Sequence, residues 1–479
     1  MNRIFKSLVI VLFLILASRN ADASADGAWT ALVATKGNVK GYPRVVEELV
    51  EEKLYFAAVP YIKEYLTRAS SIESKRIDRL IDEVVTYVGV KQFEVLPTRI
   101  LEKTSAPSIK YILAKKYFRS GNYKKAMESI NGTIPRAHGT KPFALFLEAS
   151  IHSIQRRFKS AISSYNECVE QSRSQVKRTQ SKNRKRQLEI NRDYCLVGVA
   201  RTQFANNEYE KANLSYLDLD KRSPIWPEIL FEEAWNSFYL QDYNRSLGKL
   251  VTYKAPILNF VFNPEVSVLE AMTYLEMCLY EDAKKVSDRF QNTYEGQSIG
   301  LDKLLRKHKK NYRYYYLLAK SRKAGRIRGN NLINRLLMSV NRDSAYIELV
   351  DNFVRGKEEI EKVSKISNPK LKRILTINLK ESLLLQRNLI GAYVRKSLNV
   401  AKHHLGRSLE AHTYIKLEML KRTKDRLYGI EPEPLRGRGD IKYLKRNEKQ
   451  YFWTFDGEFW ADELGDYVFS LKSECEVSL

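Results

Sequence analysis

The residues of this chain that could do chemistry are six histidines and one pair of neighbouring acids. His404 and His412 would share one helix face, but they lie about two turns apart, whereas metal ligands on a helix normally lie about one turn apart. Asp456 and Glu458 could be imagined as a glycosidase pair, but acids this close in a glycine-containing turn are more typical of a surface. No HExxH, Walker A, GxGxxG or GxSxG stretch occurs. We therefore expect no catalytic residues, no metal, no cofactor and no enzymatic activity.

The first 25 residues have the three-part pattern of a secretory signal peptide. A short basic segment ends at Lys6, an apolar run covers 7–17, and small-residue cleavage sites lie within 21–25. The apolar run is too short to span a bilayer, which takes about 20 residues. We expect 1–25 to be cleaved, with an uncleaved anchor as the alternative. The protein would then be exported, periplasmic or envelope-associated.

The chain is strongly basic, with a formal net charge of +26. Residues 1–25 carry three basic side chains and one acidic side chain, so the remainder keeps +24. Inside a cell this charge would suggest nucleic acid, which an exported chain is not expected to meet. The remaining anionic partners are lipid surfaces, envelope polymers and acidic proteins, although basic runs also form solvated helix faces.

The four cysteines, Cys168, Cys195, Cys278 and Cys475, form no CxxC pair, which excludes zinc-ribbon and thioredoxin-type sites. Export permits disulfides, and a bridge between Cys168 and Cys195 is conceivable because they fall in neighbouring predicted helices. Burial as small unpaired core residues is the other interpretation, and we favour it.

One spacing recurs five times: a small residue, eight others, an aromatic, two others, and a second small residue. The second small residues are 35, 51, 34 and 37 positions apart, close to the period of about 34 typical of paired-helix repeats. A degenerate match over 84–96 and an upstream pair at 55–58 precede the five. The five matches are Ala114–Tyr123–Ala126, Ala149–Phe158–Ala161, Ala200–Tyr209–Ala212, Ala234–Tyr243–Ser246 and Ala271–Tyr280–Ala283.

The physical meaning of this spacing is a helix–turn–helix unit. The two small residues let the paired helices approach, and the aromatic covers their contact at the turn. One pair cannot bury its apolar face, so neighbouring units share a core. We predict an all-α fold in which residues 26–294 stack as helical repeats.

Residues 42–294 resemble the tetratricopeptide repeat (TPR) family, although most family Trp and Pro positions are replaced. The resemblance implies a right-handed α-solenoid with a concave groove that binds extended segments or other proteins. The positions one, four and five after the first small residue would line that groove. They give Lys115, Arg119, Arg201, Trp235 and Tyr239 as partner-binding residues, a basic and aromatic set that suits a partner with acidic and apolar residues. The Phe residues at these positions, Phe118, Phe204 and Phe238, are expected to pack against neighbouring helices instead.

Two basic stretches interrupt or follow the repeats. The insertion 173–192 has eight basic residues against Glu189, and it is either a helix extension or a mobile loop. It is interpreted as a solvated connector, with an anion-docking arm as the alternative. The stretch 303–328 mixes basic residues with four tyrosines, and it predicts a helix with tyrosines inward and charges outward.

The C-terminal part is divided into three regions. Residues 295–430 form a basic region of long helices, an antiparallel hairpin or coiled-coil arm, with recurrent leucines from Leu371. Residues 431–450 form a linker, and 451–479 an aromatic-acidic tail with a short strand over 467–471. We expect this tail to dock on the basic helical body or on a partner, because such dense aromatics are rarely left in water. The tail resembles those of exported bacterial TPR proteins of envelope and motility systems.

These observations favour a non-enzymatic exported TPR scaffold that mediates protein–protein interactions in a cell-envelope complex. The alternative is a basic adaptor that binds anionic envelope polymers or a membrane surface. The sequence does not determine the partner or the oligomeric state.

Overall fold

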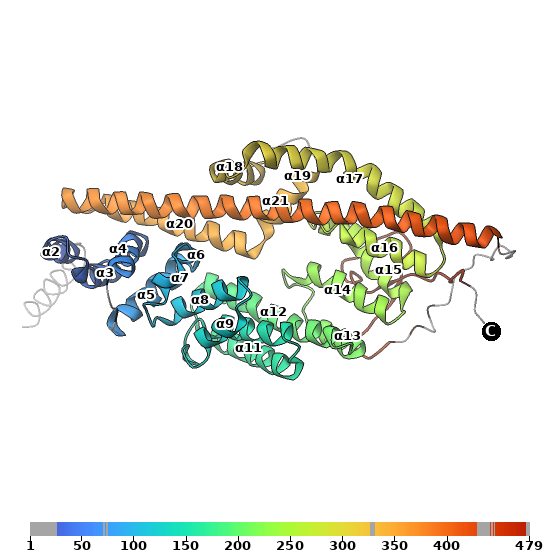
Figure 1. Ribbon diagram of the computed structural model, residues 1–479, viewed down its shortest axis with the longest axis horizontal. Helices are drawn as coiled ribbons and strands as arrows, with labels where there is room; N and C mark the ends of the chain where they lie inside the picture. The colour runs from blue at the N-terminus through green and yellow to red at the C-terminus, as the bar shows by residue number, and fades with distance from the viewer. Residues whose placement is uncertain are drawn as a thin grey trace, which may run out of the picture. The chain divides into compact units, whose positions relative to one another are not determined.

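The computed structural model describes residues 26–69, 72, 75–325, 331–428, 441, 444 and 446–475. The predicted signal peptide and most of the predicted linker 431–450 lie outside the described residues. The described part is all-α apart from one two-stranded sheet, as predicted (Figure 1). Within this part, no helix combines the length and apolar character needed to cross a bilayer.

The chain divides into two compact units. Unit 1 comprises the residues up to Thr140 together with Glu348–Leu389, and unit 2 comprises Lys141–Ile347 together with Ile390–Leu479. The units do not follow the sequence divisions at 294 and 430, because segments from the long-helix region pack within both of them. Each unit is described by itself.

The described residues of unit 1 before residue 140 form nine helices. They are α2 (Asp26–Ala34), η1 (Val39–Gly41), α3 (Tyr42–Glu51), α4 (Tyr55–Arg68), α5 (Lys75–Val88), α6 (Lys91–Glu94), α7 (Thr98–Leu101), α8 (Pro107–Arg119) and α9 (Tyr123–Ile130). Most of α20 (Ser344–Ser364) and the first part of α21 (Pro369–Tyr428) complete this unit.

Unit 2 contains the later repeats. Its helices are α10 (Lys141–Ile154), α11 (Phe158–Arg178), α12 (Lys182–Ala205), α13 (Tyr209–Tyr216), α14 (Trp226–Tyr239), α15 (Tyr243–Val251), η2 (Thr252–Lys254), η3 (Pro256–Leu258), α16 (Glu265–Glu276), α17 (Tyr280–His308), α18 (Tyr312–Lys323) and α19 (Asn331–Arg342). The later part of α21 and the strands β1 (Trp453–Thr454) and β2 (Tyr467–Val468) complete it.

The repeat spacing corresponds to one recurrent turn. In all five predicted repeats the aromatic is the first residue of the second helix, and the residue two positions earlier has a positive φ. A backbone amide just after that residue donates to the carbonyl five positions earlier, as in a Schellman helix end. A positive-φ residue also lies two positions before α4 and α6, and the Leu54 amide donates to the Leu49 carbonyl before α4. The two degenerate repeats are therefore helix pairs as well. The positive-φ residues are Lys53, Gly89, Gly121, Arg156, Asn207, Gln241 and Cys278.

The two basic stretches are largely helical. The insertion 173–192 extends α11 to Arg178 and starts α12 at Lys182, so it forms helix extensions rather than a loop. In the second stretch α18 buries Tyr315 completely, while Arg313 and Lys320 are exposed. The other tyrosines of α18 are half-buried.

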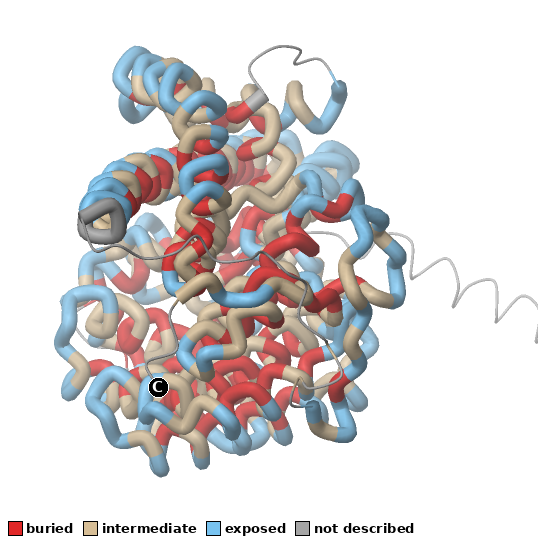
Figure 2. Tube along the Cα trace, turned by 90° about the vertical axis from the view of Figure 1, so that its right-hand side faces the viewer, coloured by how far each residue is buried: buried red, intermediate tan, exposed pale blue. Residues whose placement is uncertain are grey.

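The long helices pack against the repeats of their own unit. In unit 1 the predicted leucine positions Leu371, Leu375 and Leu379 are buried in one core with residues of α3–α8 such as Phe56. In unit 2, Ile415 of α21 joins a core with α16 and α17. Figure 2 shows the result as buried and exposed residues alternating along individual helices.

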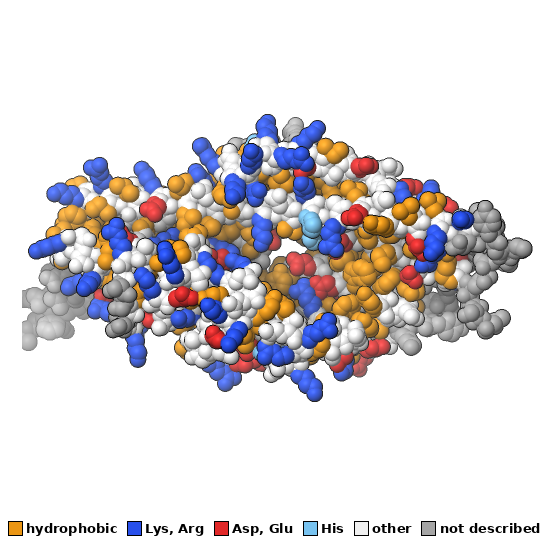
Figure 3. Space-filling view, viewed as in Figure 1, with side chains coloured by type: hydrophobic (Ala, Val, Ile, Leu, Met, Phe, Trp, Pro, Cys, Tyr) orange, Lys and Arg blue, Asp and Glu red, His pale blue; other side chains and the backbone are white. Residues whose placement is uncertain are grey.

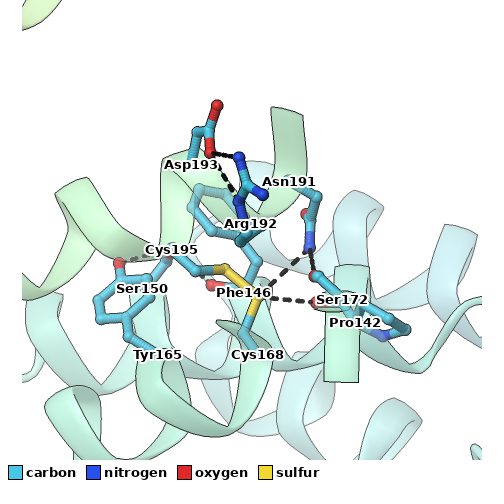
Figure 4. Close-up of a disulfide and its surroundings, with 10 residues drawn as sticks. All are labelled: Pro142, Phe146, Ser150, Tyr165, Cys168, Ser172, Asn191, Arg192, Asp193 and Cys195. Atoms are coloured by element: carbon cyan, nitrogen blue, oxygen red, sulfur yellow. Dashed lines mark hydrogen bonds and ion pairs between the residues drawn. A yellow bond between two sulfur atoms is a disulfide. The ribbon is translucent and has the colours of Figure 1, made fainter. Parts of the chain in front are cut away.

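All four cysteines are paired, so the favoured interpretation of unpaired core residues is wrong. Cys168 on α11 and Cys195 on α12 form a fully buried disulfide, surrounded by side chains such as Phe146 and Asn191 (Figure 4). Cys278, at the last repeat turn, pairs with Cys475 in the tail. The disulfide partner of Cys278 could not be predicted from the spacing of the repeats, because 197 residues separate the two cysteines.

The tail docks on the helices of unit 2. Of the two predicted alternatives, the helical body and a partner, this is the first. β1 and β2 are parallel, and Tyr467 passes so close to α15 that a Cβ at Gly248 would lie 1.7 Å from its carbonyl oxygen. The amide of Phe469 donates to the carbonyl of Asn244 at 3.1 Å. The ammonium group of Lys221 lies 2.6 Å from Asp466, so the acidic residues of the tail do meet basic residues of the helical body.

Candidate partner-binding surface

Arg201 on α12 and Glu232 on α14 join the first helices of two neighbouring repeats in unit 2. The Arg201 guanidinium donates to both carboxylate oxygens of Glu232, at 2.8 and 2.5 Å. The Tyr216 hydroxyl donates to Glu232 at 3.3 Å. Burial by itself would lower the pKa of Arg201, but the hydrogen bond and the charge of Glu232 outweigh it and raise the pKa. The charge of Arg201 is therefore already neutralised within the chain.

An aromatic strip follows Arg201 along the same repeats. It consists of Phe204, Tyr209, Trp235, Phe238 and Tyr239. The rings of Tyr209 and Tyr239 are stacked at 5.3 Å, and Phe204 meets Tyr239 edge-on at 5.4 Å. Trp235 lies 6.0 Å from Tyr239 and 5.5 Å from Phe238. Tyr239 nevertheless keeps 51% of its surface exposed, so the strip presents a supported aromatic ring to solvent.

An acidic pocket of about 560 Å³ lies beside the same face of α14. Glu228 and Glu232 are one turn apart on this face, and Trp235 follows at the next turn. Figure 3 shows acidic side chains gathered beside α14 on the side facing α21. The pocket also takes side chains from the loop after η3, α16, α19 and α21. The side chains from these elements include Phe262, Glu265, Tyr393, Lys396 and His404.

The negative charges of the acids in this pocket are only partly offset by nearby basic groups. The side chain of Glu228 reaches solvent, yet the pocket wall removes water from it, and this desolvation raises its pKa. Arg201 opposes the rise, whereas Asp343 and Glu232 add to it. His404 Nδ1 lies 3.5 Å from Glu265 Oε1. Three acids, Glu228, Glu232 and Glu265, thus line this pocket, whereas the predicted groove residues on α12 and α14 are basic and aromatic.

The predicted groove residues of unit 1 are also engaged. Lys115 Nζ lies 3.0 Å and an Arg119 nitrogen 3.2 Å from the carboxylate of Glu94, which Lys91 approaches at 2.7 Å. Burial alone would raise the pKa of Glu94, but these three cations outweigh it and hold the pKa at about 2. Lys115 and Arg119 therefore stabilise the junction of α6 and α8.

The repeat positions lie inside the helix pairs. Tyr123 is half-buried, and its ring meets Phe118 edge-on at 5.7 Å. Phe204 and Phe238 make the same contact with the aromatic of their own turn, so these Phe residues pack as expected. The nine alanines of the pattern, all without exposed surface, are Ala114, Ala126, Ala149, Ala161, Ala200, Ala212, Ala234, Ala271 and Ala283.

The acids that meet the predicted cations are not among the residues predicted from the sequence. Glu232 and Glu228 could have been predicted, because they lie one and two turns before Trp235 on the same face of α14. Glu94 gave no such signal, because it precedes the helix that carries Lys115. Among the described residues, no group of three or more His, Cys, Asp and Glu side chains is placed to hold a metal ion.

The fold is a TPR-like array of helix pairs followed by long helices. No protein-family model matches the chain, and no curated protein matches it. Among solved structures, the apo form of RapI has a TM-score of 0.34 at 10% identity, covering 72% of this chain and 97% of that one. A STAND-type signal transduction ATPase with a tetratricopeptide repeat sensor, from Pyrococcus horikoshii, has a TM-score of 0.33 at 15% identity. That match covers 81% of this chain and 54% of the ATPase. At these TM-scores neither likeness supports a conclusion, and the repeat assignment rests on the helix pairs themselves.

Proposed function

We propose that this chain is a non-enzymatic scaffold that binds a protein partner along the exposed face of α14. The observation that carries this proposal is the aromatic strip, in which Tyr239 is stacked on Tyr209 and supported by Trp235 while half of its surface stays in water. Large aromatic side chains that are already ordered lose little conformational entropy on binding, and they are common anchors of protein interfaces.

The partner segment should carry an apolar residue and a basic residue. The apolar residue would meet the strip at Trp235 and Tyr239, and the basic one would enter the acidic pocket beside Glu228. Complementary charge of this kind selects the partner and accelerates association more than it adds affinity. A partner segment with a basic residue thus replaces the partner with acidic residues that is expected from the sequence.

The location that we propose is outside the cytoplasm, in an envelope complex. Both disulfides support this, since structural disulfides form and persist in oxidising compartments. The N-terminal sequence supports it independently through its signal-peptide pattern.

The proposal is tested by photo-crosslinking in the native cell with a benzophenone amino acid at Tyr239. The matched control carries it at Tyr414, which is 64% exposed on α21. We expect one discrete protein adduct at Tyr239 and none of the same mass at Tyr414. The variant Trp235→Ala should lower the yield of that adduct about tenfold. Equal adducts at both positions, or an adduct insensitive to Trp235→Ala, would contradict the proposal.

The alternative function is binding of anionic envelope polymers or a membrane surface. Arg313, Lys320 and Lys323, exposed along α18, favour it. Such binding should fall steeply between about 0.05 and 0.5 M salt, since screening shortens the range of surface charges. Vesicle co-sedimentation with anionic lipid at the two salt concentrations distinguishes it from the first function.

A further inference from the structure

The docked tail presents two aromatic rings to solvent at one place. Tyr451 is 68% and Trp453 is 46% exposed. Phe452 between them lies under the guanidinium of Arg245, 4.6 Å from its ring centroid. Because side chains alternate across an extended backbone, Tyr451 and Trp453 lie together on the side opposite Phe452.

The backbone that carries these rings is held in place. The amide of Trp453 donates to the carbonyl of Asp466, and the amide of Phe455 to that of Val468, each at 3.2 Å. The partner strand β2 in turn rests against α15 at Gly248. The backbone at Trp453 is therefore fixed before any ligand arrives, which reduces the entropy cost of binding.

The two rings form one wall of a pocket of about 360 Å³. The pocket lies on the side of α14 that carries Trp226 and Leu230, away from the acidic pocket. Its charged lining residues are Lys221, Lys449, Asp462, Asp466 and Glu233, and the buried Glu233 is paired with Lys249.

Both ammonium groups that line the pocket are already paired with acids. Lys221 lies 2.6 Å from Asp466, and Lys449 lies 2.8 Å from Asp218. An anion would have to separate these pairs, and a cation would meet the ammonium groups. A neutral ligand that accepts and donates many hydrogen bonds meets no such cost.

We propose that this pocket binds a neutral oligosaccharide. A sugar ring has an apolar C–H face, which fits the exposed faces of Tyr451 and Trp453, and a rim of hydroxyl groups. Those hydroxyls can donate to the carboxylates and accept from the ammonium groups that surround the rings. Aromatic walls with a few placed polar groups are typical of small-ligand sites.

The test is calorimetric titration of the full chain with chitohexaose and cellohexaose, with heparin as the anionic comparison. We expect one neutral oligosaccharide to bind equally at about 0.05 and 0.5 M salt. Trp453→Ala should weaken that binding about tenfold or more, since it removes a stacking face. Trp460→Ala is the matched control, because Trp460 is 59% exposed on the same tail but does not line the pocket, and it should leave binding unchanged.

Tyr451→Ala is a second variant for the case in which Trp453→Ala loosens the tail. It should disturb the packing of the tail less, because two thirds of the Tyr451 surface already faces water. It should also weaken binding while the helical circular dichroism and the Cys278–Cys475 bridge persist. Absence of binding to both neutral oligosaccharides would overturn the proposal. Binding of heparin alone, or equal losses in Trp453→Ala and Trp460→Ala, would overturn it too.

Discussion

The carboxylate of Glu359 accepts a hydrogen bond from the backbone amide of Phe56 at 2.9 Å, across 303 residues of sequence. It also accepts from the amide of Ala57 at 3.2 Å. These are among the first amides of α4, which have no partner within the helix, so a residue of α20 caps α4 within unit 1. Burial raises the pKa of Glu359 to about 7, although the amides lower it.

This cap makes the stability of unit 1 depend on pH. Between the ordinary pKa of 4.5 and about 7, the folded chain still holds a proton that the unfolded chain has lost. The free energy of unfolding should therefore fall as the pH rises through that window, by up to about 3 kcal/mol. Glu359→Gln keeps an acceptor oxygen but cannot ionise, so it should lose this slope in urea unfolding measured from pH 4.5 to 8.

The control is Glu358→Gln, which changes an exposed neighbour and should keep the wild-type slope. Glu359→Ala should destabilise unit 1 at pH 4.5 by about 1–3 kcal/mol, because the amides of Phe56 and Ala57 lose their acceptor. This loss should shrink as the pH rises toward 8, because the variant also lacks the ionisable group. Identical slopes for wild type and Glu359→Gln would contradict the assignment.

His412 should make the stability of unit 2 depend on pH in the opposite direction. The ring is fully buried, with Nδ1 3.1 Å from Ser287 Oγ and the ring of Phe290 at 4.5 Å. Burial, with help from Lys416, lowers its pKa from 6.5 to about 4. Between these values the unfolded chain binds a proton that the folded chain excludes, so stability should be lost as the pH falls.

His412→Gln should therefore flatten the acid limb between pH 6.5 and 4, as measured by calorimetric melting temperature. His403→Gln is its matched control, since His403 is exposed on the same helix. An acid limb that is unchanged in His412→Gln, or that disappears in His403→Gln, would show that another group causes it.

The two disulfides should differ in their reduction. Cys168 and Cys195 have no exposed surface, whereas Cys278 and Cys475 are half-buried. Since exchange requires access of a thiolate to sulfur, mild reductant should open the Cys278–Cys475 bridge first. Iodoacetamide labelling and peptide mapping of the native protein would measure the order, and early labelling of Cys168 would disprove it.

Tail docking should depend on the absence of a side chain at Gly248. Gly248→Ala would place Cβ 1.7 Å from the Tyr467 carbonyl oxygen, so β2 must move. We expect protease cleavage within 446–475 to be at least about fivefold faster with unchanged helical circular dichroism, because overpacking costs about 1–3 kcal/mol. Gly296→Ala, on α17 with no atom within 4 Å of its Cβ, should leave cleavage unchanged.

Sequence alone determined the repeat architecture. The aromatic that starts each second helix, such as Tyr123, and the buried alanines, such as Ala126, were located from spacing. This succeeded because the contact between paired helices is local, and the helical period fixes which residues face each other. The degenerate repeats were found for the same reason, although only the positive φ of Lys53 and Gly89 reveals their turns.

Tertiary structure alone decided the charge of the candidate surface and the partners of the distant segments. The sequence places Arg201 among the partner-binding residues, yet Glu232 from the next repeat neutralises its charge. The sequence favours an unpaired core position for Cys278, yet its disulfide partner lies in the tail. Helical periodicity fixes contacts within a few turns. Ion pairs, disulfides and helix caps instead depend on which remote segments pack together, and only burial of the shared cores determines that.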